Sequence, residues 1–148
     1  MQEILEQLPY SDPFLFVDEI LKIDSDSIEG SYTFSANSEF YKGHFKNHPV
    51  TPGVILTECM AQIGVVCLGI HLLNKEDDDK RKAKIALTST DMEFLKPVYP
   101  GEKVKVVSTK QYFRFNKLKC RVEMFNSEDS LVCRGIISGM ILKNKDEE

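Results

Sequence analysis

A nearly continuous apolar run, Val54 to Leu73, constrains the fold of this 148-residue chain more than any other feature. Pro52 suits the first turn of a helix, because it lacks the amide hydrogen that has no partner there. The helix would extend for about 30 Å at the standard rise per residue. The run is nearly long enough to span a bilayer, but Glu58 and Gln62 within it would be costly in lipid. Apolar residues occupy nearly all its faces, so we predict a helix wrapped by protein and no association with a membrane.

The segments around this helix are rich in β-forming residues. A short amphipathic helix opens the chain, and a long polar loop at 36–53 precedes the apolar run. We predict strands over residues 13–23, 28–35, 85–90, 103–115, 119–126 and 131–142, with a solvated charged loop at 75–84. A sheet of about six strands must bury one face, and only the long helix is available to cover it. The sequence therefore predicts one α+β domain over residues 1–148, in which an antiparallel sheet wraps around one long central helix.

Composition and charge restrict the class of partner. The chain is 42% hydrophobic and 28% charged, with a formal net charge of −4. This hydrophobic fraction is too high for a disordered chain, and the acidic balance argues against a general nucleic-acid binder. The charge is uneven, because residues 1–30 hold eight acids and one base, whereas residues 85–125 hold eight bases and four acids. The chain could therefore have a local basic surface that binds an acidic partner.

The cysteines and the N-terminal sequence bear on location. Cys59, Cys67, Cys120 and Cys133 lie far apart and form no CxxC motif, so neither a zinc ribbon nor a redox motif is indicated. Free, buried thiols are typical of a reducing compartment. The N-terminal sequence MQEILEQLPY lacks the basic start and the apolar core of an export signal. We therefore expect a cytoplasmic protein.

The residues best suited to catalysis are clustered just before the long helix and in its first turns. His44 is a loop residue that could act as a base near neutral pH. Glu58 lies on an otherwise apolar stretch, where a carboxyl group tends to have a raised pKa and to serve as an acid. The helix start at Gly53 and Val54 offers unpaired amide hydrogens that could stabilise a developing enolate. This set suits proton abstraction next to a carbonyl.

Other interpretations of the same residues stay open at this point. Glu58 could be an ordinary solvated or ion-paired helix residue. His44 and His48 have HxxxH spacing, but their context is not helical, so we expect no metal site and regard His48 as a loop residue. His71 is expected to interact with carbonyls at the helix end. From the residues alone, an acid–base enzyme and a plain structural domain are both compatible with the chain.

A longer motif narrows the choice. GHFKNHPVTPGVILTECMAQ at 43–62 resembles the signature of the β-hydroxyacyl-acyl-carrier-protein dehydratases, in which a GHF loop leads into a central helix with E-x-M-A-Q. LPYSDPFLFVDEI at 8–20 and MEFLKPVYPGEKVKV at 92–106 resemble the flanking segments of that family. The resemblance covers about the whole chain in order and implies the hotdog fold, a sheet wrapped around one long helix.

The resemblance also implies roles for individual residues. His44 matches the catalytic histidine, and Glu58 matches the helix carboxylate of the FabZ-type branch, where the FabA-type branch has aspartate. The backbone of Gly53 and Val54 matches the positions that bind the thioester carbonyl, and Gln62 completes a FabZ-like Ala-Gln pair. We expect Gln62 and Phe45 to contribute to substrate binding. Candidates for the wall of an acyl tunnel, or for plain core, are Phe45, Met92, Phe94 and Tyr99.

Three positions depart from the family pattern. Lys46 stands where FabZ-type members usually have proline, which leaves the subfamily and a double-bond isomerase side activity open. Thr51 stands where the family often has methionine, a change that bears on the shape of the tunnel. Ser11 and Asp12 replace the usual His/Arg before the N-terminal PFL segment.

The implied activity is reversible dehydration of a (3R)-hydroxyacyl thioester to the trans-2-enoyl thioester, in fatty-acid or polyene-type biosynthesis. It implies no metal and no cofactor beyond the phosphopantetheine arm of an acyl carrier protein, the expected partner. In this family the histidine of one subunit faces the carboxylate of another, so the resemblance implies a dimer or a trimer of dimers. The alternatives are a hotdog acyl-thioesterase and a non-catalytic acyl-binding or scaffold subunit of a hotdog heterodimer.

Overall fold

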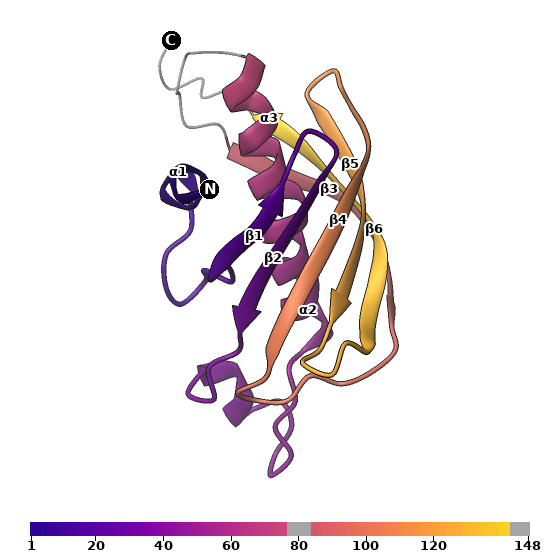
Figure 1. The fold of residues 1–148 in the computed structure, drawn as a ribbon. Helices are drawn as coiled ribbons and strands as arrows, with labels where there is room; N and C mark the ends of the chain where they lie inside the picture. Colours follow the sequence, from indigo (N-terminus) through magenta and orange to yellow (C-terminus); the bar gives the residue numbers. More distant parts are fainter. Residues whose placement is uncertain (77–83, 143–148) are drawn as a thin grey trace.

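A curled sheet holds one long helix along its concave face (Figure 1). The computed structural model describes residues 1–76 and 84–142. Its six strands are antiparallel and lie in the order β1-β2-β4-β5-β6-β3. Their bounds are Glu19–Ile23 for β1, Ser27–Thr33 for β2, Lys84–Phe94 for β3, Lys103–Arg114 for β4, Lys117–Phe125 for β5 and Leu131–Leu142 for β6. The predicted α+β hotdog architecture is confirmed.

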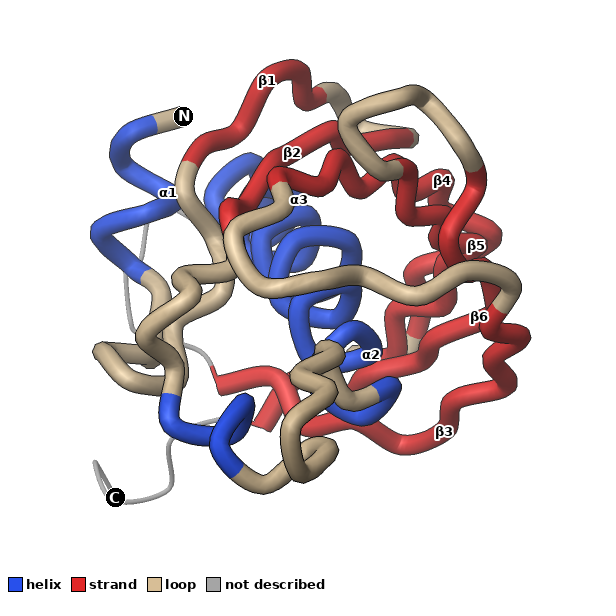
Figure 2. The backbone as a smooth tube through the Cα atoms, turned by 90° about the horizontal axis from the view of Figure 1, so that it is seen from below, coloured by secondary structure: helices blue, strands red, loops and turns tan. Residues whose placement is uncertain are grey.

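The central helix is continuous from Gly53 to Glu76, three residues beyond the predicted end at Leu73. It consists of α2 (Gly53–Ala61), a π-helical stretch η2 (Gln62–Cys67) and α3 (Leu68–Glu76). By length and composition it could cross a membrane, but 72% of its most apolar window is buried inside the protein. Figure 2, which looks along the helix, shows the strands around it. This helix is therefore the core element of the domain and not a membrane span.

Alternating strand residues explain why the sheet closes on the helix. In β5, Leu118, Cys120, Val122 and Met124 are buried, and the residues between them are more exposed. This period of two places one apolar face of the sheet against the helix. At Gly64 the helix approaches β4 closely, since a Cβ atom there would lie 3.0 Å from the Cβ of Ser108. The apolar helix and the alternating strands thus form one continuous core.

The N-terminal segment differs from its predicted structure. A strand was expected over residues 13–23, but β1 begins only at Glu19. The backbone before it is held by a side chain of the central helix, because Gln62 bonds to the Phe16 amide at 2.8 Å and to the Phe14 carbonyl at 3.0 Å. Strand-like composition therefore produced an irregular segment in which Phe14 and Phe16 pair with the helix, while Asp18, next to β1, pairs with Ser31 of β2. The short helix α1 (Gln2–Gln7) precedes this segment, as predicted.

The other expectations on local structure hold with shifted ends. β3 continues to Phe94, four residues beyond the predicted end, because it pairs along its length with β6. The long loop contains a 3₁₀ turn, η1 (Glu39–Lys42). Of the charged run at 75–84, residues 77–83 lie outside the described residues, as does the chain after 142. The four cysteines are free and buried, as predicted.

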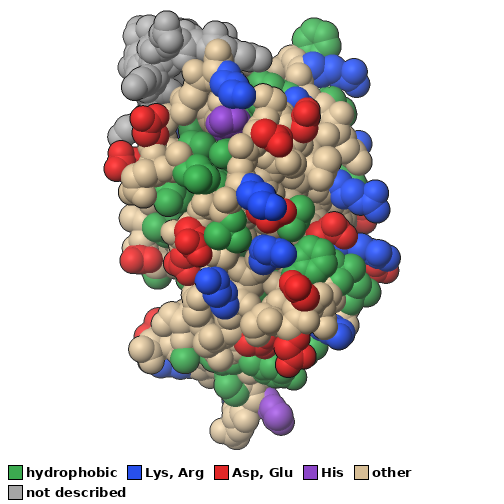
Figure 3. Space-filling model, in the orientation of Figure 1, with side chains coloured by type: hydrophobic (Ala, Val, Ile, Leu, Met, Phe, Trp, Pro, Cys, Tyr) green, Lys and Arg blue, Asp and Glu red, His purple; other side chains and the backbone are tan. Residues whose placement is uncertain are grey.

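Acidic and basic side chains are interspersed on the face of the molecule in Figure 3. Lysines of the predicted basic stretch lie near acids from other segments: Lys103 near Glu19 at 3.6 Å, Lys105 near Asp129 at 3.9 Å and Lys110 near Asp26 at 3.6 Å. The uneven charge of the sequence is therefore partly evened out on the surface. Folding places the acidic first thirty residues beside the basic strand β4.

Candidate active site

His44 lies in the loop that follows η1, half-buried, with its ring held by the backbone on the far side of the loop. Its Nδ1 lies 2.9 Å from the carbonyl oxygen of Val50. A carbonyl oxygen only accepts hydrogen bonds, so this contact requires a proton on Nδ1. In the neutral form of the imidazole, Nε2 is therefore the nitrogen that carries the free lone pair.

The loop around His44 is closed by backbone bonds. The Val50 amide donates to the His44 carbonyl at 2.8 Å, and Phe45 and His48 exchange two backbone bonds of 3.0 Å each. Asn47 has the positive φ of 61° that the turn requires, a conformation asparagine tolerates well. The ring of Phe45 stacks on that of His44 at 4.1 Å and is 59% exposed. The loop therefore displays His44 and Phe45 on a short, tightly bonded projection.

The helix begins with two amides that have no hydrogen-bond partner in the described chain. Pro52 precedes the first helical residue, and its carbonyl accepts from Ile55 at 2.9 Å and Leu56 at 3.1 Å. Gly53 and Val54 come before those donors, so no earlier turn of helix can accept from them. The positive end of the helix dipole adds to their ability to polarise a carbonyl. Both predicted carbonyl-binding positions therefore lie at a true helix start.

A hollow of about 450 Å³ opens beside this helix start. Its lining residues are Thr51, Gly53, Leu56, Phe94, Leu95, Lys96 and Pro97. A Cβ atom at Gly53 would lie 3.2 Å from the ring of Phe94, a tight contact that would require this ring to shift by a few tenths of an ångström. Phe94 is 49% exposed and Tyr99 is 52% exposed, and neither they nor Phe45 belong to the buried core. Only Met92, among the tunnel candidates, packs against the core.

Glu58 and Gln62 lie one turn apart on the helix and bond to each other. The Gln62 side chain is completely buried, whereas that of Glu58 is half-buried. Gln62 Nε2 donates to Glu58 Oε2 at 2.9 Å. Tyr10 lies near this carboxyl, and burial, followed by the charge of Glu58, raises the pKa of the Tyr10 phenol to about 12. The carboxyl therefore accepts a hydrogen bond from a buried amide and lies near a phenol that keeps its proton at neutral pH.

The structure brings some of the predicted site residues together and keeps others apart. His44, Gly53 and Val54 belong to one loop-and-helix unit. Across the described part of the chain, no hydrogen bond joins the His44 ring to the Glu58 carboxyl: the ring bonds to Val50 and the carboxyl to Gln62. The imidazole and the carboxyl are thus each oriented by a different neighbour.

The remaining histidines take no part in this unit. His48 is exposed in the turn after Phe45. His71 Nε2 is buried without a hydrogen-bond partner within residues 1–76 and 84–142, so the predicted bond to helix-end carbonyls is not seen there. Within the same ranges no group of three or more His, Cys, Asp or Glu side chains could hold a metal ion.

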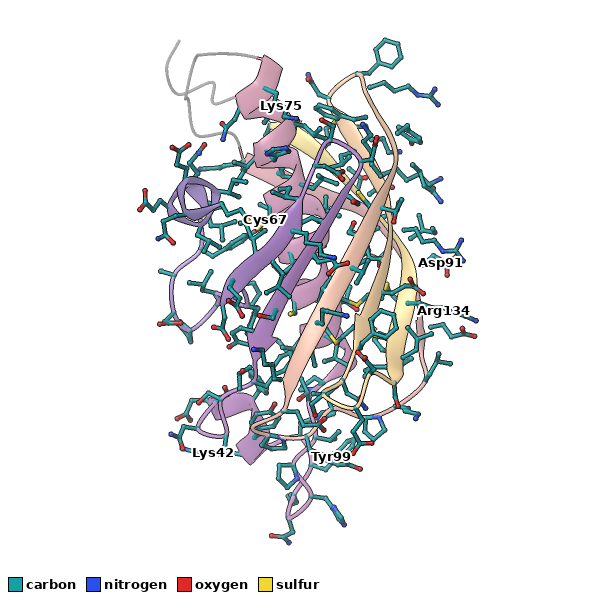
Figure 4. All side chains as sticks on the ribbon, in the orientation of Figure 1. Lys42, Cys67, Lys75, Asp91, Tyr99 and Arg134 are labelled. Atoms are coloured by element: carbon teal, nitrogen blue, oxygen red, sulfur yellow. The ribbon has the colours of Figure 1, made fainter. Side chains whose placement is uncertain are left out.

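Tyr41 was missed by the sequence analysis, and Thr51 was considered there only for its effect on the shape of the tunnel. The hydroxyls of Tyr41 and Thr51 lie 2.6 Å apart and are buried at the base of the His44 loop. The only sequence signal for this contact was a hydroxyl-bearing residue on each side of the GHF segment, Tyr41 before it and Thr51 after it. Their contact depends on the path of the loop, which sequence periodicity does not describe. Figure 4 labels Lys42 and Tyr99, which mark the neighbourhood of this loop near the lower end of the molecule.

Comparison with known proteins places the chain in a family. The sequence model of the FabA-like domain matches residues 8–134. A 3-hydroxyacyl-[acyl-carrier-protein] dehydratase FabZ of Sinorhizobium medicae is 36% identical over 150 residues, covering 99% of this chain and 92% of that protein. A FabZ dehydratase of Methylobacterium radiotolerans is 38% identical over 144 residues, covering 96% and 89%.

Solved structures agree on the fold. The dehydratase heterocomplex ApeI:P from Xenorhabdus doucetiae superimposes with a TM-score of 0.77 at 12% identity, covering 97% of this chain and 93% of that chain. A thioesterase from Haemophilus influenzae gives a TM-score of 0.60 at 18% identity, covering 84% and 78%. At these identities the likeness concerns the fold alone. Sequence and fold together show that the chain belongs to the FabA-like hotdog dehydratase family, with FabZ-type relatives along nearly its whole length.

Proposed function

We propose that the protein catalyses reversible dehydration of (3R)-hydroxyacyl-[acyl-carrier-protein] to trans-2-enoyl-[acyl-carrier-protein]. The observation that carries this proposal is the pairing, in one structural unit, of an oriented imidazole with two partnerless amides. His44 offers a free Nε2, and Gly53 and Val54 begin the helix that follows its loop. FabZ-type relatives at 36% identity support the same reaction class.

The chemistry follows from the charges that develop. The thioester carbonyl accepts a hydrogen bond from the amide of Gly53 or Val54, which stabilises negative charge on its oxygen. His44 Nε2 takes the proton from C2, and the electrons of that C–H bond form the C2=C3 double bond. The C3–O bond breaks, and Glu58, directly or through water, delivers a proton to the leaving hydroxyl, which departs as water. Proton exchange with solvent then returns His44 and Glu58 to the states in which they began.

A complete site in this proposal needs two chains. Within one described chain His44 and Glu58 are not bonded to each other, and each is oriented by its own neighbour. Strand β3 forms one edge of the sheet, and exposed apolar side chains lie along it and beside the helix start: Val54, Leu87, Phe94 and Leu95. A second copy that covers this edge would bury them. We propose a dimer, or a trimer of dimers, in which the histidine of one chain serves the carboxyl of the other.

The carrier protein is the proposed source of substrate. Lys96 lines the hollow beside the helix start and is exposed, so its charge can meet the phosphate of a phosphopantetheine arm that enters there. Three lysines of β4 already lie near acids, which makes Lys96 the better candidate for this contact. We further propose that residues 1–148 form one domain that acts in the cytoplasm without another cofactor.

The deciding experiment supplies purified protein with carrier-bound 3-hydroxyacyl substrates of several chain lengths. Mass spectrometry of the intact carrier then reports the product. Loss of one water from the carrier-bound acyl group supports the dehydratase. Release of free acid would identify a thioesterase instead, and binding without turnover on any chain length would identify a non-catalytic subunit.

A further inference from the structure

We propose that the hydrogen bond between the hydroxyls of Tyr41 and Thr51 is a clamp that positions the His44 loop against the start of helix α2 for catalysis. The inference rests on the dehydratase activity proposed above and adds two positioning residues to it. The clamp acts through the backbone, since neither hydroxyl bonds to the His44 ring or to the Glu58 carboxyl.

The clamp lies at the base of the loop. Tyr41 is the third residue of η1, and Thr51 immediately precedes the helix N-cap, Pro52. Their oxygens are 2.6 Å apart, and the two residues are only 6% and 4% exposed. All residues from 42 to 50, His44 included, lie between these two anchors. The bond therefore closes the loop from inside the protein.

Thr51 also fixes the neighbours on which the chemistry depends. Its amide donates to the carbonyl of buried Val98 at 2.8 Å. The preceding residue, Val50, exchanges two bonds with His44, through the His44 ring at 2.9 Å and the His44 carbonyl at 2.8 Å. Two residues after Thr51 comes Gly53, the first of the partnerless amides. A shift of Thr51 would therefore move the base and the carbonyl-binding amides relative to each other.

The two hydroxyls of Tyr41 and Thr51 are better suited to positioning the loop than to filling space in the core. An apolar pair would bury the same volume without a directional contact, whereas two hydroxyls hold one distance and one angle. Loss of one hydroxyl leaves the other buried and unpaired, and loss of both removes that penalty. Proton transfer depends steeply on the placement of the reacting atoms. A small displacement of the loop is therefore expected to lower kcat more than it alters binding.

The test compares Tyr41→Phe, Thr51→Val and the double variant with the unchanged protein, on carrier-bound 3-hydroxybutyryl thioester. We expect each single variant to lower kcat about tenfold with KM within about twofold, because positioning affects the chemical step. The double variant should lose no more than either single variant, since one bond is removed in all three. Thr51→Ser keeps the hydroxyl and should restore kcat. Tyr32→Phe is the matched control, because the Tyr32 hydroxyl bonds to no described residue.

A second readout does not depend on activity. Amide hydrogen exchange over residues 43–51 should be about tenfold faster in Tyr41→Phe and Thr51→Val, with the strands unchanged. Unchanged exchange in both variants would overturn the clamp, whatever the activity. Faster exchange with unchanged kcat would also overturn it. If the unchanged protein dehydrates no substrate, the proposed function fails, and the exchange measurement alone decides whether the clamp holds the loop.

Discussion

The side-chain amide of Gln62 donates a hydrogen bond of 2.9 Å to Glu58 Oε2 while it holds the N-terminal segment. The same amide accepts from the Phe16 backbone and donates to the Phe14 carbonyl. One fully buried side chain therefore satisfies backbone groups that no strand reaches and orients the proposed acid. The stability of the fold and the geometry of the proposed site therefore both depend on Gln62.

Replacing Gln62 by leucine should lower both stability and turnover. Leucine is of similar size but leaves the buried Phe16 amide without its partner, a loss of about 1–3 kcal/mol. Chemical denaturation should show this loss in the free energy of unfolding, and kcat should fall because Glu58 is no longer held. Gln111→Leu, on an exposed part of β4, is the control and should change stability by less than about 0.5 kcal/mol. Equal stability of the two variants would contradict this role of Gln62.

Replacing His44 by alanine should remove the base while the fold persists. General base catalysis contributes about 10²–10⁴-fold, so kcat should fall by about that factor. His48→Ala is a matched control within the same loop, because the His48 backbone, and not its side chain, bonds to Phe45. Steady-state kinetics of both variants give the comparison. A similar loss in both variants would show that loop integrity, and not the imidazole, is what matters.

Mixing two inactive variants should restore activity if sites are shared between chains. A dimer of one His44→Ala chain and one Glu58→Gln chain has one site with both groups intact. Random pairing makes half of the dimers mixed, so about a quarter of the normal activity should return. The control mixture pairs His44→Ala with the double variant, which has no intact combination. If the first mixture stays as inactive as the control, each chain uses its own pair and the shared site is refuted.

The stability of the protein should fall as pH rises above about 9, partly because of Cys67. Burial raises the pKa of the Cys67 thiol from 9.0 to about 12. Above pH 9 the unfolded thiol loses its proton while the folded one keeps it, so the unfolded state binds fewer protons and gains stability with pH. Between about pH 9 and 11, the free energy of unfolding should fall more steeply than in Cys67→Ala, by about 1.4 kcal/mol per pH unit. Parallel curves from urea titrations would contradict this contribution.

Local patterns were enough to predict the elements that repeat a simple period. The apolar run from Val54 to Leu73 predicts a buried helix, and the β-forming residues of 131–142 predict β6 with its observed bounds. The C-terminal end of β3 was not predictable, since three of its last four residues are exposed and the strand is extended there by pairing with β6. The same reason explains the N-terminal segment, where composition favoured a strand and a distant glutamine determined the outcome.

The sequence by itself determined the central helix, the antiparallel strands and the order of His44, Gly53, Val54 and Glu58 along the chain. Periodicity and motif spacing are local properties, and they can be read from the sequence without knowledge of the fold. Only the tertiary structure decided that Gln62 holds both Glu58 and a segment 46 residues away, and that Tyr41 meets Thr51. The first contact spans 46 residues and the second closes a loop of ten, so neither follows from local periodicity, and both depend on how the packed core brings segments together.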